Sequence, residues 1–367
     1  MELAGVNLIG LADMAISRAG GGWGPPAAAA GLPAWVSSIS VGAWAQISGT
    51  NLSSVEPGSP PPGSTGPSSK IGAWTSLVVD ESTSTVYQIA GGGHGDYSGN
   101  EADALALNVE TPAWANVLAP SATVTNGNYY ADGKPSARHH YYGVVWNSAD
   151  SKIMLPSGSR YSDGGITDKL DAYSISGNAY AAAGTHPDRP ASLASQEVTP
   201  VCRDPRNDNI YVFGNFNVAK WTRSTNTWSS PISNQSAPAP NGPSAFDSTR
   251  NVIALLRTTT VIEEYAPDSN AFTSRTLTGA SLPSVNEAAM VYVPALDAYL
   301  VRYSGSGGAV YKINASTWVV SDYGATGGGS VPASTPGPFN KFLYVPTLGG
   351  CVYVPSYTGN AWFLRTE

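Results

Sequence analysis

The sequence predicts an all-β protein, a β-propeller of six four-stranded antiparallel blades, and three observations support this fold class. One hairpin pattern of two apolar strands recurs six times along the 367 residues. A pair of large side chains at a constant spacing follows five of the six hairpins. The last hairpin is followed by only one more strand, and a segment near the N-terminus matches the strand that is missing. Repetition of this kind is typical of propeller blades.

Each hairpin consists of an apolar strand, a bend and a second apolar strand that ends in small residues. The copies are SLVVD…TVYQIAGG (76–92), YGVVWN…KIMLPSG (142–158), PVCRD…NIYVFGN (200–215), SAFD…NVIALLR (244–257), MVYVP…AYLVRYSG (290–305) and FLYVP…CVYVPSY (342–357). The bends carry residues that favour turns, namely Asp80, Asn147, Asp204, Asp247, Pro294 and Pro346. A repeat of about 40 to 50 residues indicates one propeller rather than two domains.

The third and fourth strands of five blades are marked by large side chains seven residues apart. The pairs are Leu107/Trp114, Tyr173/Tyr180, Trp221/Trp228, Tyr265/Phe272 and Tyr311/Trp318. Antiparallel strands that face each other across a short turn bring such side chains together. We therefore expect each pair to form a cross-strand contact within its blade.

The sixth blade requires a strand from the other end of the chain. FLYVP, CVYVP and NAWFLRTE supply three strands, and GAWAQISG (42–49) matches the fourth, with Trp44 as its aromatic residue. Pairing of this segment with the one that contains Trp362 closes the ring and removes an open sheet edge. The alternative is a seventh blade within 50–75 or 118–138, although neither stretch has the hairpin pattern.

This organisation divides the chain into an N-terminal segment, 1–34, and a propeller, 35–367. The propeller comprises a closing strand (35–49), a Pro/Ser/Gly linker (50–69) and the blades (70–367). We expect one short helix at 3–17 and a role for the N-terminal segment in attachment, docking or homo-oligomer formation.

The composition argues against several classes of partner. The chain has 19 basic and 26 acidic residues and no Lys/Arg cluster, which argues against nucleic acid or an anionic membrane. Cys202 and Cys351 lack metal-ligand spacing and predict buried thiols. Glu2, Asn7 and Asp13 interrupt the apolar N-terminal stretch, which has no cationic region before it. We expect neither a classical signal peptide nor a membrane span.

The four histidines are predicted to lie on one face of the propeller. The loop between second and third strands and the connection between blades open on the same face. His94 falls in such a loop of the first blade, His139 and His140 in the connection to the second blade, and His186 in the connection to the third. Candidate ligand contacts on this face are His94, Asp96, Tyr97, Arg138, Tyr161, His186, Tyr303 and Tyr357.

Histidine, tyrosine and arginine in one mouth suit β-elimination from a uronic-acid polysaccharide. A cation neutralises the carboxylate, a base removes the α-proton and an acid protonates the leaving oxygen. Arg160 would bind the carboxylate, His139 or His140 would be the base, and Tyr142 the acid, with His94 assisting. This set is similar to the one in propeller-type ulvan lyases, and the resemblance is by residue type and blade.

Each candidate also has a purely structural interpretation. Because side chains alternate along a strand, one of His139 and His140 is expected to point inward. His94 would then hydrogen-bond across the channel, and Arg160 would cover an aromatic ring or bind a carbonyl group. Inter-blade packing is the alternative for two tyrosines, Tyr303 and Tyr357.

Calcium binding is a further alternative for the acidic loop. Asp96, Asn100, Glu101 and Asp103 offer oxygen ligands, but no calcium-binding register of known type is present. We therefore predict no metal and no cofactor.

Two resemblances extend these expectations. The glycine pair Gly91 and Gly92, followed by the aromatic pair, resembles Kelch repeats over most of 70–367. GGGHGDYSGNE also resembles a loop in propeller proteins of bacteria and tailed bacteriophages. The second resemblance implies a virion protein of the tail, the fibre or another exposed position, which needs no export signal because lysis releases it.

Two functional hypotheses follow from the sequence. The first is a virion-associated propeller whose histidine-lined face binds a host surface polysaccharide or a neighbouring virion protein. The second is a polysaccharide lyase similar to the ulvan lyases. The predicted localisation is the virion, with secretion without a classical signal peptide as the alternative.

Overall fold

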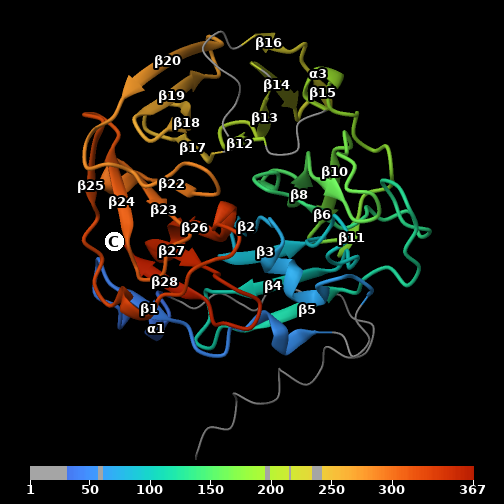
Figure 1. Cartoon of the computed structure of the whole chain (residues 1–367), viewed down its shortest axis with the longest axis horizontal. Coiled ribbons are helices and arrows are strands. Elements are labelled where there is room, and N and C mark those ends of the chain that lie inside the picture. The colour runs from blue at the N-terminus through green and yellow to red at the C-terminus, as the bar shows by residue number, and fades with distance from the viewer. Residues whose placement is uncertain (1–30, 57–60, 195–198, 215, 234–241) are drawn as a thin grey trace, which may run out of the picture.

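The structure, a computed structural model, describes residues 31–367 except 57–60, 195–198, 215 and 234–241. The helix expected at 3–17 lies outside the described residues. Six small antiparallel sheets stand in a ring, which confirms the all-β, six-bladed propeller (Figure 1). The innermost strand of each sheet contacts the innermost strands of its two neighbours, so the ring is complete.

The first three blades follow one another along the chain. Blade 1 contains β2 (Val78–Asp80), β3 (Thr85–Ile89), β4 (Ala102–Ala106) and β5 (Trp114–Leu118). Blade 2 contains β7 (Val145–Asn147), β8 (Lys152–Leu155), β10 (Asp171–Ser174) and β11 (Ala179–Tyr180). Blade 3 contains β12 (Val201–Asp204), β13 (Asn209–Gly214), β14 (Asn217–Thr222) and β15 (Thr227–Trp228), with β16 (Ile232–Ser233) also paired to β14.

The remaining blades repeat the order. Blade 4 contains β17 (Ser244–Asp247), β18 (Val252–Thr258), β19 (Val261–Ala266) and β20 (Ala271–Thr276). Blade 5 contains β22 (Ala289–Val293), β23 (Ala298–Arg302), β24 (Val310–Asn314) and β25 (Val319–Asp322), and β21 (Thr278–Gly279) pairs with β25. Blade 6 contains β26 (Phe342–Val345), β27 (Gly350–Tyr353), β28 (Trp362–Arg365) and β1 (Trp44–Gln46).

Short helices and one small extra sheet complete the described secondary structure. The α-helices are α1 (Ala34–Ser37), α2 (Ser69–Gly72) and α3 (Ala191–Ala194). The 3-10 helices are η1 (Leu52–Val55), η2 (Gly66–Ser68), η3 (Pro294–Leu296), η4 (Gly328–Ser330), η5 (Phe339–Lys341) and η6 (Pro346–Leu348). The extra sheet pairs β6 (Arg138–His139) with β9 (Ser159–Arg160). Among the described residues, no helix has the length and apolar character that a membrane crossing requires.

The ring closes as the sequence predicts. Strand β1 is antiparallel to β28, with Trp44 opposite Leu364, and it lies at the outer edge of blade 6. The Trp44 indole nitrogen donates a hydrogen bond to the Gly308 carbonyl at 2.9 Å. In Figure 1 this early strand lies directly beside the red C-terminal strands. Residues 50–56 and 61–75 carry no strand, so they do not form a seventh blade.

The core lies between blades rather than within one layer. All five residues of β3 and all five of β4 are buried, because both faces of these middle strands pack against neighbouring blades. The outer strand β20 is mostly exposed. Cys202 and Cys351 are buried free thiols, as the sequence predicts.

Three of the five predicted aromatic pairs are cross-strand neighbours. Tyr173 lies opposite Tyr180, Trp221 opposite Trp228, and Tyr265 opposite Phe272. Each first member also donates a hydrogen bond to the side chain of an asparagine with positive φ in the turn, and these residues are Asn178, Asn226 and Asn270. Asparagine tolerates this left-handed conformation, which explains its recurrence.

The other two predicted pairs are wrong. Trp114 lies opposite Leu105 rather than Leu107, and Tyr311 lies opposite Asp322 rather than Trp318. In both blades the strand pairing ends before the predicted residue, so a longer turn shifts the register. Trp318 itself has a φ of 61° and donates its backbone N–H to Asn314 within that turn.

Candidate functional site

The glycine-rich loop at 89–101 is held in place by hydrogen bonds to two later segments. Gly91 forms a parallel bridge with Arg138 of β6. The backbone N–H of His94 donates to the carbonyl of Arg160 in β9 at 3.0 Å. The N–H of Gly95 donates to the carbonyl of Tyr161 at 2.7 Å. Loop 89–101, β6 and β9 therefore form one mouth structure over blades 1 and 2.

The glycines of this loop allow the segments to approach closely. A Cβ atom on Gly93, which has a φ of 64°, would stand 2.3 Å from the backbone nitrogen of His139. A Cβ atom on Gly92 would stand 2.5 Å from the Tyr97 carbonyl oxygen. Outside the loop, a Cβ atom on Gly164 would stand 2.4 Å from the nearest atoms of the His94 ring. Such contacts are closer than any side chain tolerates.

The mouth brings two of the predicted histidines together. The ring centroids of His94 and His139 are 5.4 Å apart, and the centroid of the Trp74 ring lies 5.1 Å from that of His139. His139 is buried, and its Nε2 lies 3.0 Å from Oδ2 of Asp96. His140 is buried as well, so the expectation that only one of the two points inward is wrong. The other Asp96 oxygen accepts a hydrogen bond from Thr65 at 3.0 Å. We call the surface formed by Trp74, His94 and Asp96 over His139 the mouth surface.

Arg160 lies at this mouth, but its charge is already neutralised. Its Nε and Nη2 donate to the two oxygens of Asp163 at 3.1 and 2.7 Å. Its Nη1 donates to Asn128 at 3.2 Å. The ion pair occupies the Nε/Nη2 edge of the guanidinium, and a substrate carboxylate would have to compete with Asn128 for the remaining edge.

The roles predicted for His140 and Tyr142 do not fit their positions. His140 is fully buried, and burial holds its pKa well below the ordinary histidine value. Tyr142 is also buried, and burial raises its pKa well above the ordinary value. Its hydroxyl donates to the Ala288 carbonyl at 2.9 Å, and its ring packs on Phe339. Neither can act as base or acid on a substrate at the surface, because the packing excludes the substrate.

Four of the predicted ligand contacts have structural partners instead. Arg138 is buried in an ion pair with Asp171 at 2.6 Å. Tyr97 is buried and donates to Glu101 at 2.7 Å. The remaining two are Tyr303, which packs on Tyr311, and Tyr357, which donates to Glu56. Tyr161 is half-buried beside the loop, where its backbone holds Gly95.

The prediction that all four histidines line one rim is wrong for His186. Its Nδ1 lies 2.8 Å from the side-chain oxygen of Asn226, and its ring packs on Trp221. Asn226 belongs to the third-to-fourth strand turn, which opens on the opposite face. The connection between blades 2 and 3 runs along the outer strand of blade 3, where the Pro187 carbonyl accepts a hydrogen bond from Trp228.

The acidic residues that follow the loop surround a lysine. The Nζ of Lys70, which is fully buried, lies 2.8 Å from Glu101, 3.1 Å from Asp103 and 3.2 Å from Glu56. These carboxylates hold the pKa of Lys70 above its ordinary value, although burial alone would lower it. Within the described part of the chain, no group of three or more side chains is arranged to hold a metal ion.

Comparison with known proteins establishes similarity in fold alone. No protein-family model matches the chain, and no curated protein matches it. A solved structure of YjhT matches with a TM-score of 0.54 and 11% identity, over 81% of this chain and 94% of that one. A nidogen/laminin complex matches with a TM-score of 0.42 and 12% identity, over 68% of this chain and 77% of that one.

Trp74 and Lys70 were not predicted from the sequence as site residues. Trp74 lies just before the first strand of blade 1, in the position of a connection between blades. The same assignment of loops to faces would have placed it at the mouth. Lys70 gave no comparable signal, since its carboxylate partners come from three separate positions, Glu56, Glu101 and Asp103.

Proposed function

We propose that the protein binds carbohydrate at the mouth surface. The observation that carries this proposal is Trp74, a large aromatic side chain that is 37% exposed and packs on His139, the residue that His94 and Asp96 also contact. The C–H face of a sugar ring packs on an indole, while the sugar hydroxyls need nearby donors and acceptors. An exposed tryptophan next to an imidazole and a carboxylate offers both kinds of contact.

The groups of this surface are held in position before any ligand binds. The Trp74 carbonyl accepts a hydrogen bond from the backbone N–H of Tyr141 at 2.7 Å, and the Trp74 ring packs on His139. Asp96 is held by His139 and Thr65. Pre-organised groups lose little conformational freedom on binding, which favours affinity.

Binding is favoured over β-elimination by the state of the other candidates. A lyase needs a base, an acid and a free carboxylate clamp close together. His139 is the remaining candidate base, but Arg160 is paired with Asp163 and Tyr142 is buried. Carbohydrate binding requires none of these three groups to react.

The virion association is a separate part of the proposal. It rests on the resemblance of the GGGHGDYSGNE loop to loops of phage propellers and on the glycan-binding type of scaffold. The position of the gene tests it. A gene that lies far from any tail or capsid genes would count against a phage particle.

A glycan array probed with the full chain tests carbohydrate binding. We expect binding to a subset of polysaccharides, and a loss of about tenfold or more in affinity for Trp74→Ala, because an aromatic platform dominates such an interface. Asp96→Asn should weaken binding less. Phe216→Ala is the matched control, since Phe216 is also aromatic and 49% exposed but lies on blade 3.

Two outcomes would count against the proposal. One is no binding by the wild-type chain to any glycan of the array. The other is an equal loss for Trp74→Ala and Phe216→Ala. If the same glycans instead yield ultraviolet-absorbing unsaturated products, and His139→Ala abolishes them, the lyase hypothesis replaces simple binding.

A further inference from the structure

Residues 62–66, within the stretch predicted as a linker, form part of the wall of the mouth surface. They run alongside the glycine-rich loop and are joined to it by backbone hydrogen bonds. Ser64 donates its N–H to the Gly95 carbonyl at 2.9 Å. Thr65 donates its N–H to the Asp96 carbonyl at 3.0 Å. The mouth therefore has a second polar edge, which comes from a segment that precedes blade 1.

The hydroxyl groups of this segment lie against one carboxylate. The Thr65 hydroxyl donates to Oδ1 of Asp96 at 3.0 Å, and the Ser64 hydroxyl donates to the same oxygen at 3.4 Å. Oδ2 of Asp96 lies 3.0 Å from Nε2 of His139. Ser64 and Thr65 are exposed, and Asp96 keeps 24% of its side chain exposed, so a ligand can reach all three groups.

The hydrogen bonds within this edge leave acceptors, rather than donors, available to a ligand. A hydroxyl group has one donor and two acceptor lone pairs, and an ionised carboxylate has acceptors only. Because Ser64 and Thr65 donate to Asp96, the positions left on these two hydroxyls are acceptors. The exposed part of the Asp96 carboxylate adds further acceptor positions. This edge of the mouth therefore matches a ligand that brings hydrogen-bond donors.

The cationic groups of the mouth are occupied by other partners. The Arg160 guanidinium donates to Asp163 and Asn128. His139 is buried, with its Nε2 directed at Asp96. A sugar carboxylate would have to displace a partner of Arg160, and it would also meet the negative charge of Asp96. Like charges placed side by side weaken binding, so an acidic sugar is disfavoured here.

On the basis of the carbohydrate binding proposed above, we infer that the mouth surface takes an uncharged sugar through two neighbouring hydroxyl groups. The sugar ring packs on Trp74. One hydroxyl donates to Asp96, and the next donates to the hydroxyl oxygen of Ser64 or Thr65. A carboxylate, sulfate or phosphate in place of such a hydroxyl would bring acceptors to acceptors, so sugars that carry these groups bind more weakly.

Matched acidic and neutral polysaccharides, added to the glycan array and probed with the full chain, test this selectivity. Carboxyl reduction converts each uronic acid into the corresponding neutral hexose and leaves the linkages unchanged, so the two members of a pair differ only at the carboxylate. We expect the glycans that the wild type binds to be uncharged. Within any pair that binds, the reduced member should bind at least tenfold more tightly. Measurements at pH 8 keep imidazoles of ordinary pKa neutral.

Asp96→Asn should reduce the preference for neutral glycans. The amide has the shape of the carboxylate, but it carries no charge and offers two N–H donors. We therefore expect the ratio of affinities for the reduced and the acidic member of a pair to fall by about threefold or more. Raising the salt concentration should lower the ratio for the wild type in the same direction, because salt screens the repulsion between exposed charges.

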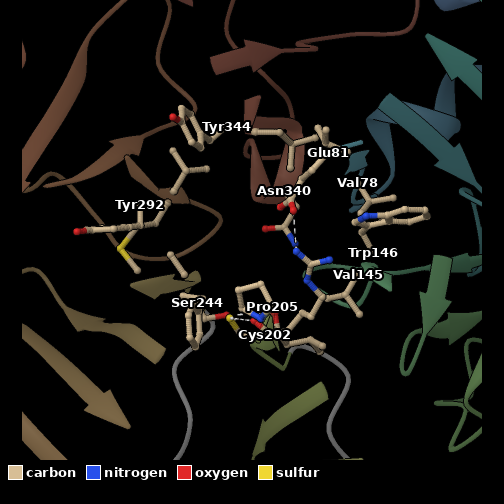
Figure 2. A pocket seen from close by; sticks show the side chains of 18 of the residues that line it. Val78, Glu81, Val145, Trp146, Cys202, Pro205, Ser244, Tyr292, Asn340 and Tyr344 are labelled. Carbon is tan, nitrogen blue, oxygen red and sulfur yellow. Dashed lines mark hydrogen bonds and ion pairs between the residues drawn. The ribbon is translucent and has the colours of Figure 1, made fainter. Parts of the chain in front are cut away.

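Glu81→Gln is the matched control for charge and for location. Glu81 lines the cavity on the axis of the ring, where Figure 2 labels it. It belongs to the turn between β2 and β3, on the face opposite the mouth surface, and its side chain is 48% exposed. The change removes one negative charge from the chain, as Asp96→Asn does, but leaves the mouth intact. We expect the preference for neutral glycans to stay at the wild-type value.

Thr65→Val tests the contribution of residues 62–66. Valine keeps the shape of threonine but removes the hydroxyl that accepts from the sugar and donates to Asp96. We expect binding of neutral glycans to weaken by about threefold to tenfold. Thr273→Val is the control, at an exposed threonine of β20 on blade 4. Neither change should shift the thermal unfolding midpoint by more than about 3 °C, which separates a contact with the sugar from an effect on folding.

The outcomes distinguish this inference from the proposed function. Equal binding of the acidic and the reduced members by the wild type would overturn the selectivity and leave carbohydrate binding in place. The same holds if Asp96→Asn and Glu81→Gln change the preference equally. Unchanged binding after Thr65→Val would remove residues 62–66 from the site. Absence of binding to every glycan would refute carbohydrate binding itself, and the selectivity with it.

Discussion

At the scale of single residues, two buried lysines show how partners decide charge. Lys70 stays charged because three carboxylates surround it. The Nζ of Lys341 donates a hydrogen bond to the Ile71 carbonyl at 3.0 Å and lies 5.8 Å from the centre of the Phe339 ring. Burial lowers the pKa of Lys341 to about 7, with Glu287 opposing the shift. Lys341 thus ties η5 to α2, and burial removes most of its charge above pH 7.

This arrangement predicts a pH dependence of stability. Between pH 7 and the ordinary lysine pKa of 10.5, the unfolded chain binds a proton at Lys341 that the folded chain does not. The free energy of unfolding should therefore rise with pH across this window, by at most about 1.4 kcal/mol per pH unit from this group. Lys341→Met should remove this contribution in urea unfolding at pH 7.5 and 9.5. Lys312→Met, at a partly exposed lysine, should keep it; identical slopes for wild type and Lys341→Met would contradict the prediction.

At the scale of elements, the glycines of the loop between β3 and β4 determine how closely the loop packs on its neighbours. Gly92 and Gly93 both have positive φ and touch neighbouring backbone. His94 follows with a φ of 45°, a conformation that non-glycine residues rarely adopt. The packing against β6 and β9 holds it there, and this places its ring beside His139.

A methyl group at Gly93 should therefore disrupt the mouth. Gly93→Ala places a Cβ 2.3 Å from the backbone of His139, so the loop and β6 must separate. We expect a loss of stability of about 1–3 kcal/mol and a loss of glycan binding. Gly305→Ala is the control, because nothing lies within 4 Å of its Cβ. Urea unfolding and the glycan array measure both, and equal stability of the two variants would refute the argument.

At the scale of the whole molecule, the ring is stabilised by the strand that closes it and by ion pairs between blades. Strand β1 brings Trp44 against the rings of Phe342 and Tyr353. Arg250 of blade 4 bridges to Asp297 of blade 5 at 2.7 Å, and Arg203 of blade 3 bridges to Glu81 of blade 1. Each bridge joins two blades on the face opposite the mouth surface.

The closing strand should carry much of the stability. Trp44 is buried and hydrogen-bonded to Gly308, so Trp44→Ala should lower the free energy of unfolding by about 3–5 kcal/mol. Trp74→Ala is the matched control, because Trp74 is partly exposed and its loss should cost far less. Thermal and urea unfolding of both variants provide the measurement. Equal destabilisation would mean that β1 does not close the ring.

Several features of the candidate site followed from the sequence because they depend on loop order. His94 and His139 were predicted to share one face, since the loop within blade 1 and the connection to blade 2 open on that face, and their rings are in contact. The burial of Tyr142 could not be predicted, because it depends on Phe339 and Ala288 from segments far along the chain. The position of His186 could not be predicted either, because the long connection between blades 2 and 3 runs along the outer strand of blade 3 and places His186 beside Asn226.

The sequence by itself determined the blade count, the strand order and the closure by Trp44, because alternation of apolar residues and turn signals are local properties. Tertiary structure alone decided which polar side chains remain available. The placement of Trp74 on His139 and the burial of Tyr142 against Phe339 and Ala288 depend on packing between segments that are far apart in the sequence. Such contacts depend on three-dimensional proximity, which the local pattern of residues does not encode.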